Sequence, residues 1–241
     1  MKKDSSKGEG RKEDLRPANG RERLMYAAMQ LAATTRSLAS LGLREVARTA
    51  GLNPNTFYRH FSSFDDLGLA VIDQLVGVLR AGLRERRRVP AAKGLTFDDT
   101  SNPTVAMERA RLVVRESVGL VLDFVTDHRE AYIVGIRELH GTSPILRKAL
   151  CKVMDDIADD MAEDVLGALR LPLLPAEEVR EISGLVIRQM SFFSLEYLEH
   201  PEQREQIREQ AERFILWLFW GALAARLPGL TPLAPTKLAE T

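Results

Sequence analysis

The chain has 241 residues, of which 45% are apolar and 28% are charged, and its 34 Lys and Arg balance 34 Asp and Glu. This composition is typical of a globular protein and excludes collagen-like, intrinsically disordered and uniformly basic chains. The single cysteine excludes an internal disulfide, as expected for a protein of the reducing cytoplasm.

The charge is distributed unevenly along the chain. Residues 1–62 hold 12 Lys or Arg against 6 Asp or Glu, so the remainder carries the compensating negative charge. Residues 1–16 are rich in Lys, Glu, Ser and Gly, which predicts a disordered basic arm, and they lack the apolar run of a signal peptide. A basic N-terminal part favours contact with nucleic acid, and a basic tail without a target is the alternative.

Residues 17–64 are expected to form one small helical domain. A first helix is predicted from about residue 17 to residue 37, with Leu24, Ala27, Ala28, Leu31 and Ala32 on its inner face. A second helix is predicted at residues 43–49, where apolar residues recur at helical spacing.

A glycine separates this second helix from a third. Gly51 predicts a left-handed turn, and Asn53 followed by Pro54 predicts a new helix start. Phe57 and Phe61 are four residues apart and are expected to be its buried pair. Two helices across a short turn form a helix-turn-helix, whose second helix enters the major groove of DNA.

The segment 43–67 resembles the DNA-binding motif of the TetR family of bacterial transcriptional regulators. The resemblance lies in Arg44-Glu45-Val46-Ala47, in Ala50-Gly51 and in Asn53-Pro54-Asn55-Thr56-Phe57-Tyr58-Arg59-His60-Phe61. It implies that Tyr58 contacts a phosphate. Two positions depart from the family pattern: Gly42 is a weaker helix cap than the usual Thr or Ser, and Phe64 stands where the family often has Lys.

Several residues of this motif are therefore expected to meet DNA. An Asn can read adenine, an Arg can read guanine, and a Tyr can hold phosphate. The predicted DNA-binding residues are Arg44, Asn53, Asn55, Thr56, Tyr58, Arg59 and His60, with Arg16 and Arg21 of the basic arm assisting.

Three further segments resemble a narrower branch of the family, the repressors of unsaturated fatty acid synthesis typified by FabR and DesT. They are residues 39–47, 65–69 and 137–143. This resemblance implies a long-chain acyl-CoA or acyl-carrier thioester as effector and no other cofactor. The alternatives are a repressor that responds to drugs or other small apolar ligands, and a ligand-binding protein whose DNA reader is vestigial.

The rest of the chain is also predicted to be helical, which gives an all-α protein of about nine helices. A connecting helix is expected at 65–88, a loop at 89–103, a ligand-binding and dimerisation domain at 104–228 and a flexible tail at 229–241. Gly and Pro divide the larger domain into helices at 104–127, 130–139, 143–169, 175–198 and 202–227.

Two sets of apolar residues in the larger domain carry the predicted ligand and dimer contacts. The candidate ligand-binding residues are Val114, Val118, Phe124, Tyr132, Ile136, Arg137, Met161, Met190 and Phe193. Arg111, Arg115, Arg137 and Arg147 are candidates for a cavity mouth, although each is an ordinary residue for a solvated helix face. The candidate dimer interface is Ile182, Val186, Phe214, Trp217 and Leu218; filling a monomer core is the alternative.

Enzyme chemistry finds no support in the sequence. It has no glycine-rich phosphate loop, GxSxG turn or HExxH pair, and its four His lack metal-ligand spacing, so neither a catalytic nor a metal site is expected. The acidic cluster at 155–163 is expected to be a solvated face, and Cys151 a buried thiol. The apolar run 214–223 is too short to span a bilayer.

The sequence thus predicts a cytoplasmic homodimeric repressor that occupies a palindromic operator in double-stranded DNA. Its regulated genes are expected to belong to fatty acid or lipid metabolism. A small apolar effector would act by tilting the helix at 65–88 and changing the distance between the two readers.

Overall fold

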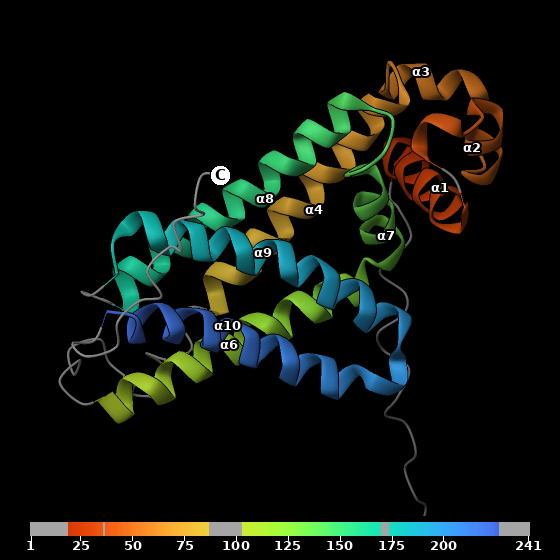
Figure 1. Ribbon diagram of the computed structural model, residues 1–241. Coiled ribbons are helices and arrows are strands. Elements are labelled where there is room, and N and C mark those ends of the chain that lie inside the picture. Colours follow the sequence, from red (N-terminus) through yellow and green to blue (C-terminus); the bar gives the residue numbers. More distant parts are fainter. Residues whose placement is uncertain (1–18, 36, 87–102, 170–173, 227–241) are drawn as a thin grey trace, which may run out of the picture.

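The computed structural model describes residues 19–35, 37–86, 103–169 and 174–226. Within these ranges the chain forms nine α-helices, with short 3₁₀ turns and one π-turn, and contains no strand. Figure 1 shows a small helical domain at one end of a larger helical body. This confirms the all-α prediction with about nine helices.

The small domain contains α1 (Gly20–Thr35), α2 (Leu43–Thr49) and α3 (Phe57–His60). The predicted third helix is shorter than expected, because the segment Pro54–Thr56 forms a 3₁₀ turn before α3 begins. The local signals are confirmed: Gly51 has a φ of 65°, and the side chain of Asn53 accepts a hydrogen bond from the backbone N–H of Asn55.

Helix α4 (Phe64–Arg86) leaves the small domain and runs along the body. Two hydrogen bonds cap its start. Ser63 Oγ accepts a hydrogen bond from the backbone N–H of Asp66, and the carboxylate of Asp66 accepts one from the backbone N–H of Ser62. The body adds α6 (Pro103–Asp127), α7 (Arg129–Glu138), α8 (Pro144–Asp164), α9 (Ala176–Glu199) and α10 (Arg204–Ala224). A π-turn, Val165–Leu169, extends α8, and a 3₁₀ turn, Pro201–Gln203, precedes α10.

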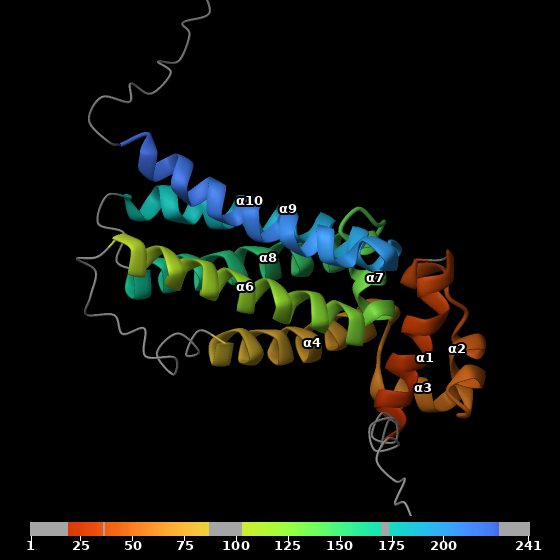
Figure 2. The same ribbon diagram turned by 90° about the horizontal axis from the view of Figure 1, so that it is seen from below.

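The body helices lie in layers. Figure 2 shows α9 and α10 on one side, α6 and α8 in the middle and α4 on the other side. The short helix α7 lies at the end of the body that faces the small domain, where it packs against α1.

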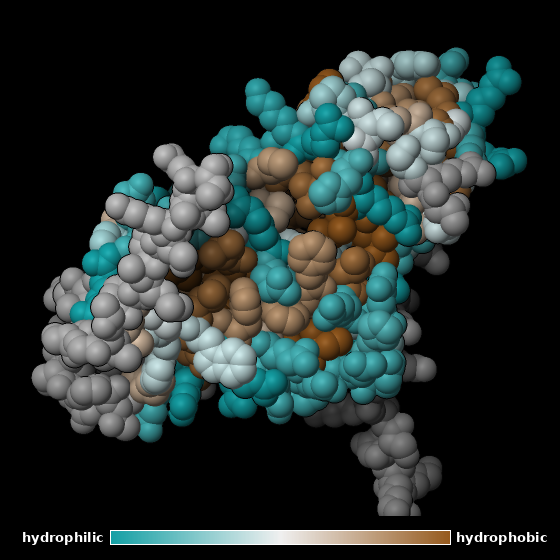
Figure 3. Space-filling model, in the orientation of Figure 1, coloured by the Kyte–Doolittle hydropathy of each residue, from teal (hydrophilic) through white to brown (hydrophobic). Residues whose placement is uncertain are grey.

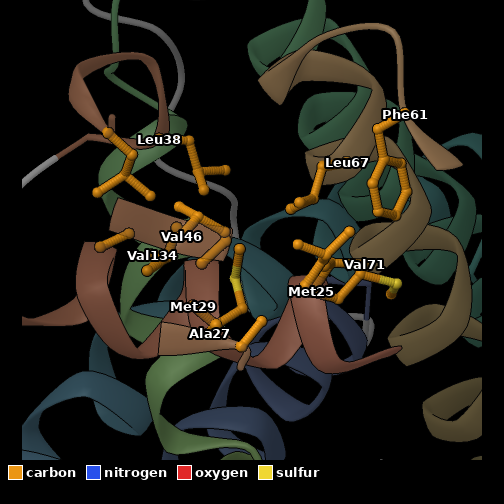
Figure 4. Packing of buried hydrophobic residues seen from close by; sticks show 14 of the residues in the cluster. Met25, Ala27, Met29, Leu38, Val46, Phe61, Leu67, Val71 and Val134 are labelled. Carbon is orange, nitrogen blue, oxygen red and sulfur yellow. The ribbon is translucent and has the colours of Figure 1, made fainter. Parts of the chain in front are cut away.

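The core of the small domain continues into the body. Figure 4 shows Met25 and Met29 of α1, Phe61 beside α3, and Leu67 and Val71 of α4 in one cluster. Val134 of α7 and Leu146 of α8 belong to the same cluster. A movement of α7 or α4 therefore acts directly on the packing of α1.

The close approach of α4 to its neighbours depends on Gly68. A Cβ built at this position would lie 2.8 Å from Cδ2 of Leu146 and 3.2 Å from Cδ1 of Leu38. The absence of a side chain thus lets α4 approach the start of α8 and the segment after α1 closely.

Two expectations about α8 are wrong. Cys151 is exposed instead of buried, because it points away from the apolar stripe that includes Leu150 and Met154. The acidic cluster is not wholly solvated: the carboxylate of Asp160 accepts two hydrogen bonds of 2.7 Å from the guanidinium of Arg80. This ion pair joins the second half of α4 to α8.

No described helix combines the length and the hydropathy that crossing a bilayer requires. The basic arm, the loop at 89–102 and the tail at 229–241 lie outside the described residues, and so does Arg16.

Candidate nucleic-acid interface and internal cavity

The turn after Gly51 presents polar side chains to solvent on a rigid apolar support. Phe57 is 1% exposed, and its ring contacts those of Phe61 and Phe64 at centroid distances of 5.8 and 5.2 Å. Tyr58, in contrast, is 69% exposed, and Arg59 and His60 are exposed beside it. The aromatic cluster thus fixes α3 while leaving its polar residues free to contact a ligand.

The start of α1 adds to this surface. The guanidinium of Arg21 lies 5.4 Å from the centre of the Phe61 ring, and Gly20 lies against the ring of His60. Arg21, Arg59 and His60 therefore gather around α3, as a surface that binds phosphates requires.

The remaining predicted DNA-binding residues lie on the same small domain. Arg44 and Asn55 are exposed, Thr56 is half-buried, and Asn53 is exposed while its side chain caps the turn. The side chain of Asn53 is therefore already engaged in the fold, and Asn55, Tyr58, Arg59 and His60 are the residues most available to bases and phosphates. Their contact with DNA stays a prediction.

The body contains a cavity of about 570 Å³ between α4, α6, α7, α8, α9 and α10. Its wall follows α6 from Met107 to His128, a run of about 30 Å at a rise of about 1.5 Å per residue. The volume lies within the range of about 300–1,000 Å³ typical of small-molecule sites. An elongated apolar molecule fits such a cavity.

Most predicted ligand-binding residues line this cavity. They are Val114, Val118, Phe124, Tyr132, Ile136, Met161 and Met190. Phe193 does not; its ring packs edge-on against Phe214 of α10 at a centroid distance of 5.9 Å. It lies on the flank of α9 that packs against α10.

Arg137 is also absent from the cavity wall, against the expectation that it lies at a mouth. Its guanidinium donates hydrogen bonds to the backbone carbonyls of Ala32 and Ala33, at 3.1 and 2.8 Å. It therefore caps the end of α1. The arginine that lines the cavity is Arg109, which is 4% exposed. It was not predicted, because in the sequence it does not differ from the other polar residues of α6.

Glu138 makes a second connection between α7 and the small domain. It is 2% exposed, and its Oε1 accepts a hydrogen bond of 2.9 Å from the backbone N–H of Leu38. Tyr132 and Ile136 on the same helix line the cavity. Helix α7 thus contacts the cavity through one face and holds the small domain through Arg137 and Glu138.

Polar groups lie at both ends of the cavity wall. His128 and Tyr132, with the nearby Ser194, lie at the end formed by α7, whereas Arg109 belongs to the first turns of α6 and Asp164 to the last turn of α8. Burial raises the pKa of Tyr132 to about 12, and the neighbouring residues Ser191 and Ser194 oppose the rise. Burial also lowers the pKa of His128, with Asp127 opposing, so both side chains are neutral at pH 7.

The outer face of α9 and α10 carries exposed apolar side chains. They are Leu185, Phe192 and Trp217, which are 51%, 62% and 69% exposed. Figure 3 shows apolar side chains on the face that these two helices form. Apolar surface of this kind is typical of a protein interface.

Two of the predicted dimer residues do not lie on this face. Ile182 and Val186 are 9% and 2% exposed and belong to the core of the same chain, because their side of α9 faces α8 and the cavity. Phe214 and Leu218 are half-buried against that core. Only Trp217 of the predicted set is largely exposed.

Among the described residues, no three His, Cys, Asp or Glu side chains converge as metal ligands would. The described residues thus form an exposed polar surface that suits an anionic polymer and a cavity that suits an apolar molecule.

Comparison with known proteins identifies the small domain. Residues 24–71 match the family described as bacterial regulatory proteins, tetR family. The matched segment spans α1, α2, α3 and the start of α4, and so includes the exposed surface around Tyr58.

Solved structures extend the similarity to the whole fold. The fatty acid degradation regulator FadR from Bacillus halodurans is 13% identical, with a TM-score of 0.62 over 86% of this chain and 97% of its own. A transcriptional regulator from Rhodococcus is 19% identical, with a TM-score of 0.62 over 84% and 97%. A TetR transcriptional regulator from Legionella pneumophila is 15% identical, with a TM-score of 0.59 over 83% and 97%. The chain therefore carries a TetR-family N-terminal domain within the fold of TetR-family regulators.

Proposed function

We propose that this protein, which carries a TetR-family N-terminal domain, is a repressor that binds a palindromic operator and responds to an apolar effector. The observation that carries the proposal is the contrast within α3: Phe57 is buried, whereas its neighbour Tyr58 is 69% exposed beside Arg59 and His60. A folded core has no need of this exposed set, whereas a DNA duplex supplies partners for each of its members.

A second copy of the chain would cover the outer face of α9 and α10. The exposed rings of Phe192 and Trp217 favour such an interface, because aromatic residues contribute strongly to association. A two-fold dimer presents two small domains to two half-sites about one helical turn apart, as a palindromic operator requires.

The effector is proposed to be a long-chain acyl thioester, and the regulated genes to be those of lipid metabolism. The elongated apolar cavity supports this assignment. So does the similar fold of FadR, a regulator of fatty acid degradation, although the two chains share 13% identity. Resemblance to the FabR and DesT branch over residues 137–143 points the same way.

The effector would act on DNA binding through α7 and α4. Filling the cavity moves residues such as Tyr132 on α7, and α7 holds α1 and Leu38 through Arg137 and Glu138. The bidentate pair of Arg80 with Asp160 ties α4 to α8 in the body. The effector changes operator affinity to the extent that it binds one arrangement of these helices better than the other.

Selection of genomic fragments by the purified protein tests the DNA-binding function. The wild type is expected to enrich a palindromic sequence at moderate salt, and the variants Tyr58→Ala and Arg59→Ala to bind it more weakly by about 1–3 kcal/mol each. Tyr26→Ala is the matched control, because Tyr26 is 53% exposed on α1 of the same domain. Failure of the wild type to enrich any sequence would indicate a vestigial reader.

A further inference from the structure

The end of the cavity nearest α7 holds a cluster of uncharged hydrogen-bonding groups. The hydroxyl of Tyr132 donates to the backbone carbonyl of Ser191 at 3.0 Å. The ring of His128 stacks against Phe124 at a centroid distance of 4.6 Å. Ser194 of α9 lies close enough to Tyr132 to lower its pKa, and all of these residues line the cavity.

Ser194 is the informative member of this cluster. It is 1% exposed, and its hydroxyl makes no hydrogen bond of acceptable geometry within the described residues. A buried hydroxyl without a partner is unfavourable, so such groups are uncommon in native proteins unless a ligand or water completes them. Because Ser194 lies on the cavity wall, a molecule in the cavity can supply the missing acceptor.

The surroundings of Ser194 favour an acceptor without charge. His128 and Tyr132 are neutral at pH 7, and Arg129, whose guanidinium donates to the backbone carbonyl of Leu198 at 2.6 Å, does not line the cavity. Arg109, the arginine among the described lining residues, lies about 30 Å away along α6. A carboxylate placed beside Ser194 would therefore meet no cationic side chain on the cavity wall at this end, whereas a carbonyl oxygen would need only the hydroxyl.

We propose that the effector carries an uncharged carbonyl, of the ester, thioester or ketone class, that accepts a hydrogen bond from Ser194, with its hydrocarbon extending along α6 toward Arg109. This proposal rests on the proposed ligand-responsive function and specifies the chemistry and orientation of the ligand. The carbonyl then lies beside Tyr132 on α7, the helix that holds the small domain through Glu138.

Three probes of similar length separate the roles of chain, carbonyl and charge: decane, methyl octanoate and octanoate. Trp220 lines the cavity and Trp217 does not, so the fluorescence of a Trp217→Phe background reports the filling of the cavity. At pH 8, methyl octanoate is expected to bind about three- to tenfold more tightly than decane, because it gains one hydrogen bond. Octanoate is expected to bind at least about tenfold more weakly than the ester.

A matched pair of variants on α9 assigns the difference to Ser194. Ser194→Ala is expected to abolish the preference for the ester over decane while leaving decane binding unchanged. Ser183→Ala is the control: Ser183 is 0% exposed and also lacks a hydrogen-bond partner in the described structure, but it is not on the cavity wall. Because neither hydroxyl holds the fold together, both variants are expected to keep wild-type thermal stability.

The outcomes distinguish this proposal from the proposed function. An ester preference that survives in Ser194→Ala, or tighter binding of octanoate than of the ester, overturns the carbonyl assignment but leaves an apolar effector in place. Failure of all three probes to bind would overturn the ligand-responsive function together with this inference. Operator binding is measured separately and is unaffected by either result.

Discussion

The small domain and the body differ in how densely their side chains are packed. Where α1, α4, α7 and α8 meet, a void of about 20 Å³ remains, whereas the cavity of the body has about 570 Å³. In the small domain the ring of Phe57 packs against those of Phe61 and Phe64, while valine and methionine side chains line much of the body's cavity. The dense region keeps a surface in fixed geometry, and the hollow region can respond to a ligand.

The largest predicted effect comes from truncating an aromatic ring in each region. Phe57→Ala is expected to lower the free energy of unfolding by about 3–5 kcal/mol, because the ring is enclosed on all sides. Phe124→Ala, at a half-buried ring on the cavity wall, is expected to lower it by about 1–2 kcal/mol, since that ring already borders empty space. Denaturant unfolding measures both values, and equal losses would remove the contrast between the regions.

The next largest effect concerns the outer face of α9 and α10. Replacing Phe192 and Trp217 by Ala is expected to weaken self-association by about 2 kcal/mol or more, because both rings are exposed in the single chain. Sedimentation velocity over a concentration series measures the change. Ile145→Ala is the control, since Ile145 is 51% exposed on α8, outside this face. A variant that dimerises like the wild type would place the interface elsewhere.

A pair of glycines on α4 tests how tightly the joint between the regions is packed. Gly68→Ala is expected to lower the free energy of unfolding by about 1–3 kcal/mol, because its Cβ would overlap Leu146. Gly77→Ala is expected to raise it by up to about 1 kcal/mol, since nothing lies within 4 Å of its Cβ and alanine favours a helix. Thermal unfolding compares the two, and a Gly68→Ala variant as stable as Gly77→Ala would contradict the close packing.

The smallest effect is a pH dependence that arises in the hollow region. The pKa of His128 lies below its usual 6.5 in the folded protein because of burial, so the unfolded chain takes up its proton first as the pH falls. The contribution of the neutral His128 ring to the free energy of unfolding is fully present above about pH 6.5. It is lost as the pH falls toward the pKa of His128 in the folded protein. Unfolding at pH 7.5 and 5.5 measures this loss, which His128→Gln should reduce.

The sequence predicted the small domain in detail because its signals are local. Gly51, Asn53 and Ser63 each fix a turn or a cap through their own backbone or nearest neighbours. The division of the third helix into a 3₁₀ turn and a single α-helical turn was missed, and so was the 3₁₀ turn at Leu38–Ser40. The matched family covers this same part of the chain.

The body was predicted less completely because its contacts join residues far apart in sequence. Helical periodicity indicated most of the cavity-lining residues, but it could not indicate that Arg137 caps α1 or that Asp160 pairs with Arg80. Similarly, the apolar residues of α9 lie on two sides of the helix. The sequence does not distinguish Ile182, which is buried in the chain, from Phe192, which is exposed.

In the proposed function, the two regions act as one sensor through α7. Its most direct test is the dissociation constant for operator DNA, measured by fluorescence anisotropy with and without saturating methyl octanoate. The wild type and Glu138→Gln, which keeps an acceptor for the Leu38 N–H, are expected to change affinity by about fivefold or more, whereas Glu138→Ala responds less. An unchanged operator affinity in the wild type, while Trp220 fluorescence shows a filled cavity, would contradict this coupling.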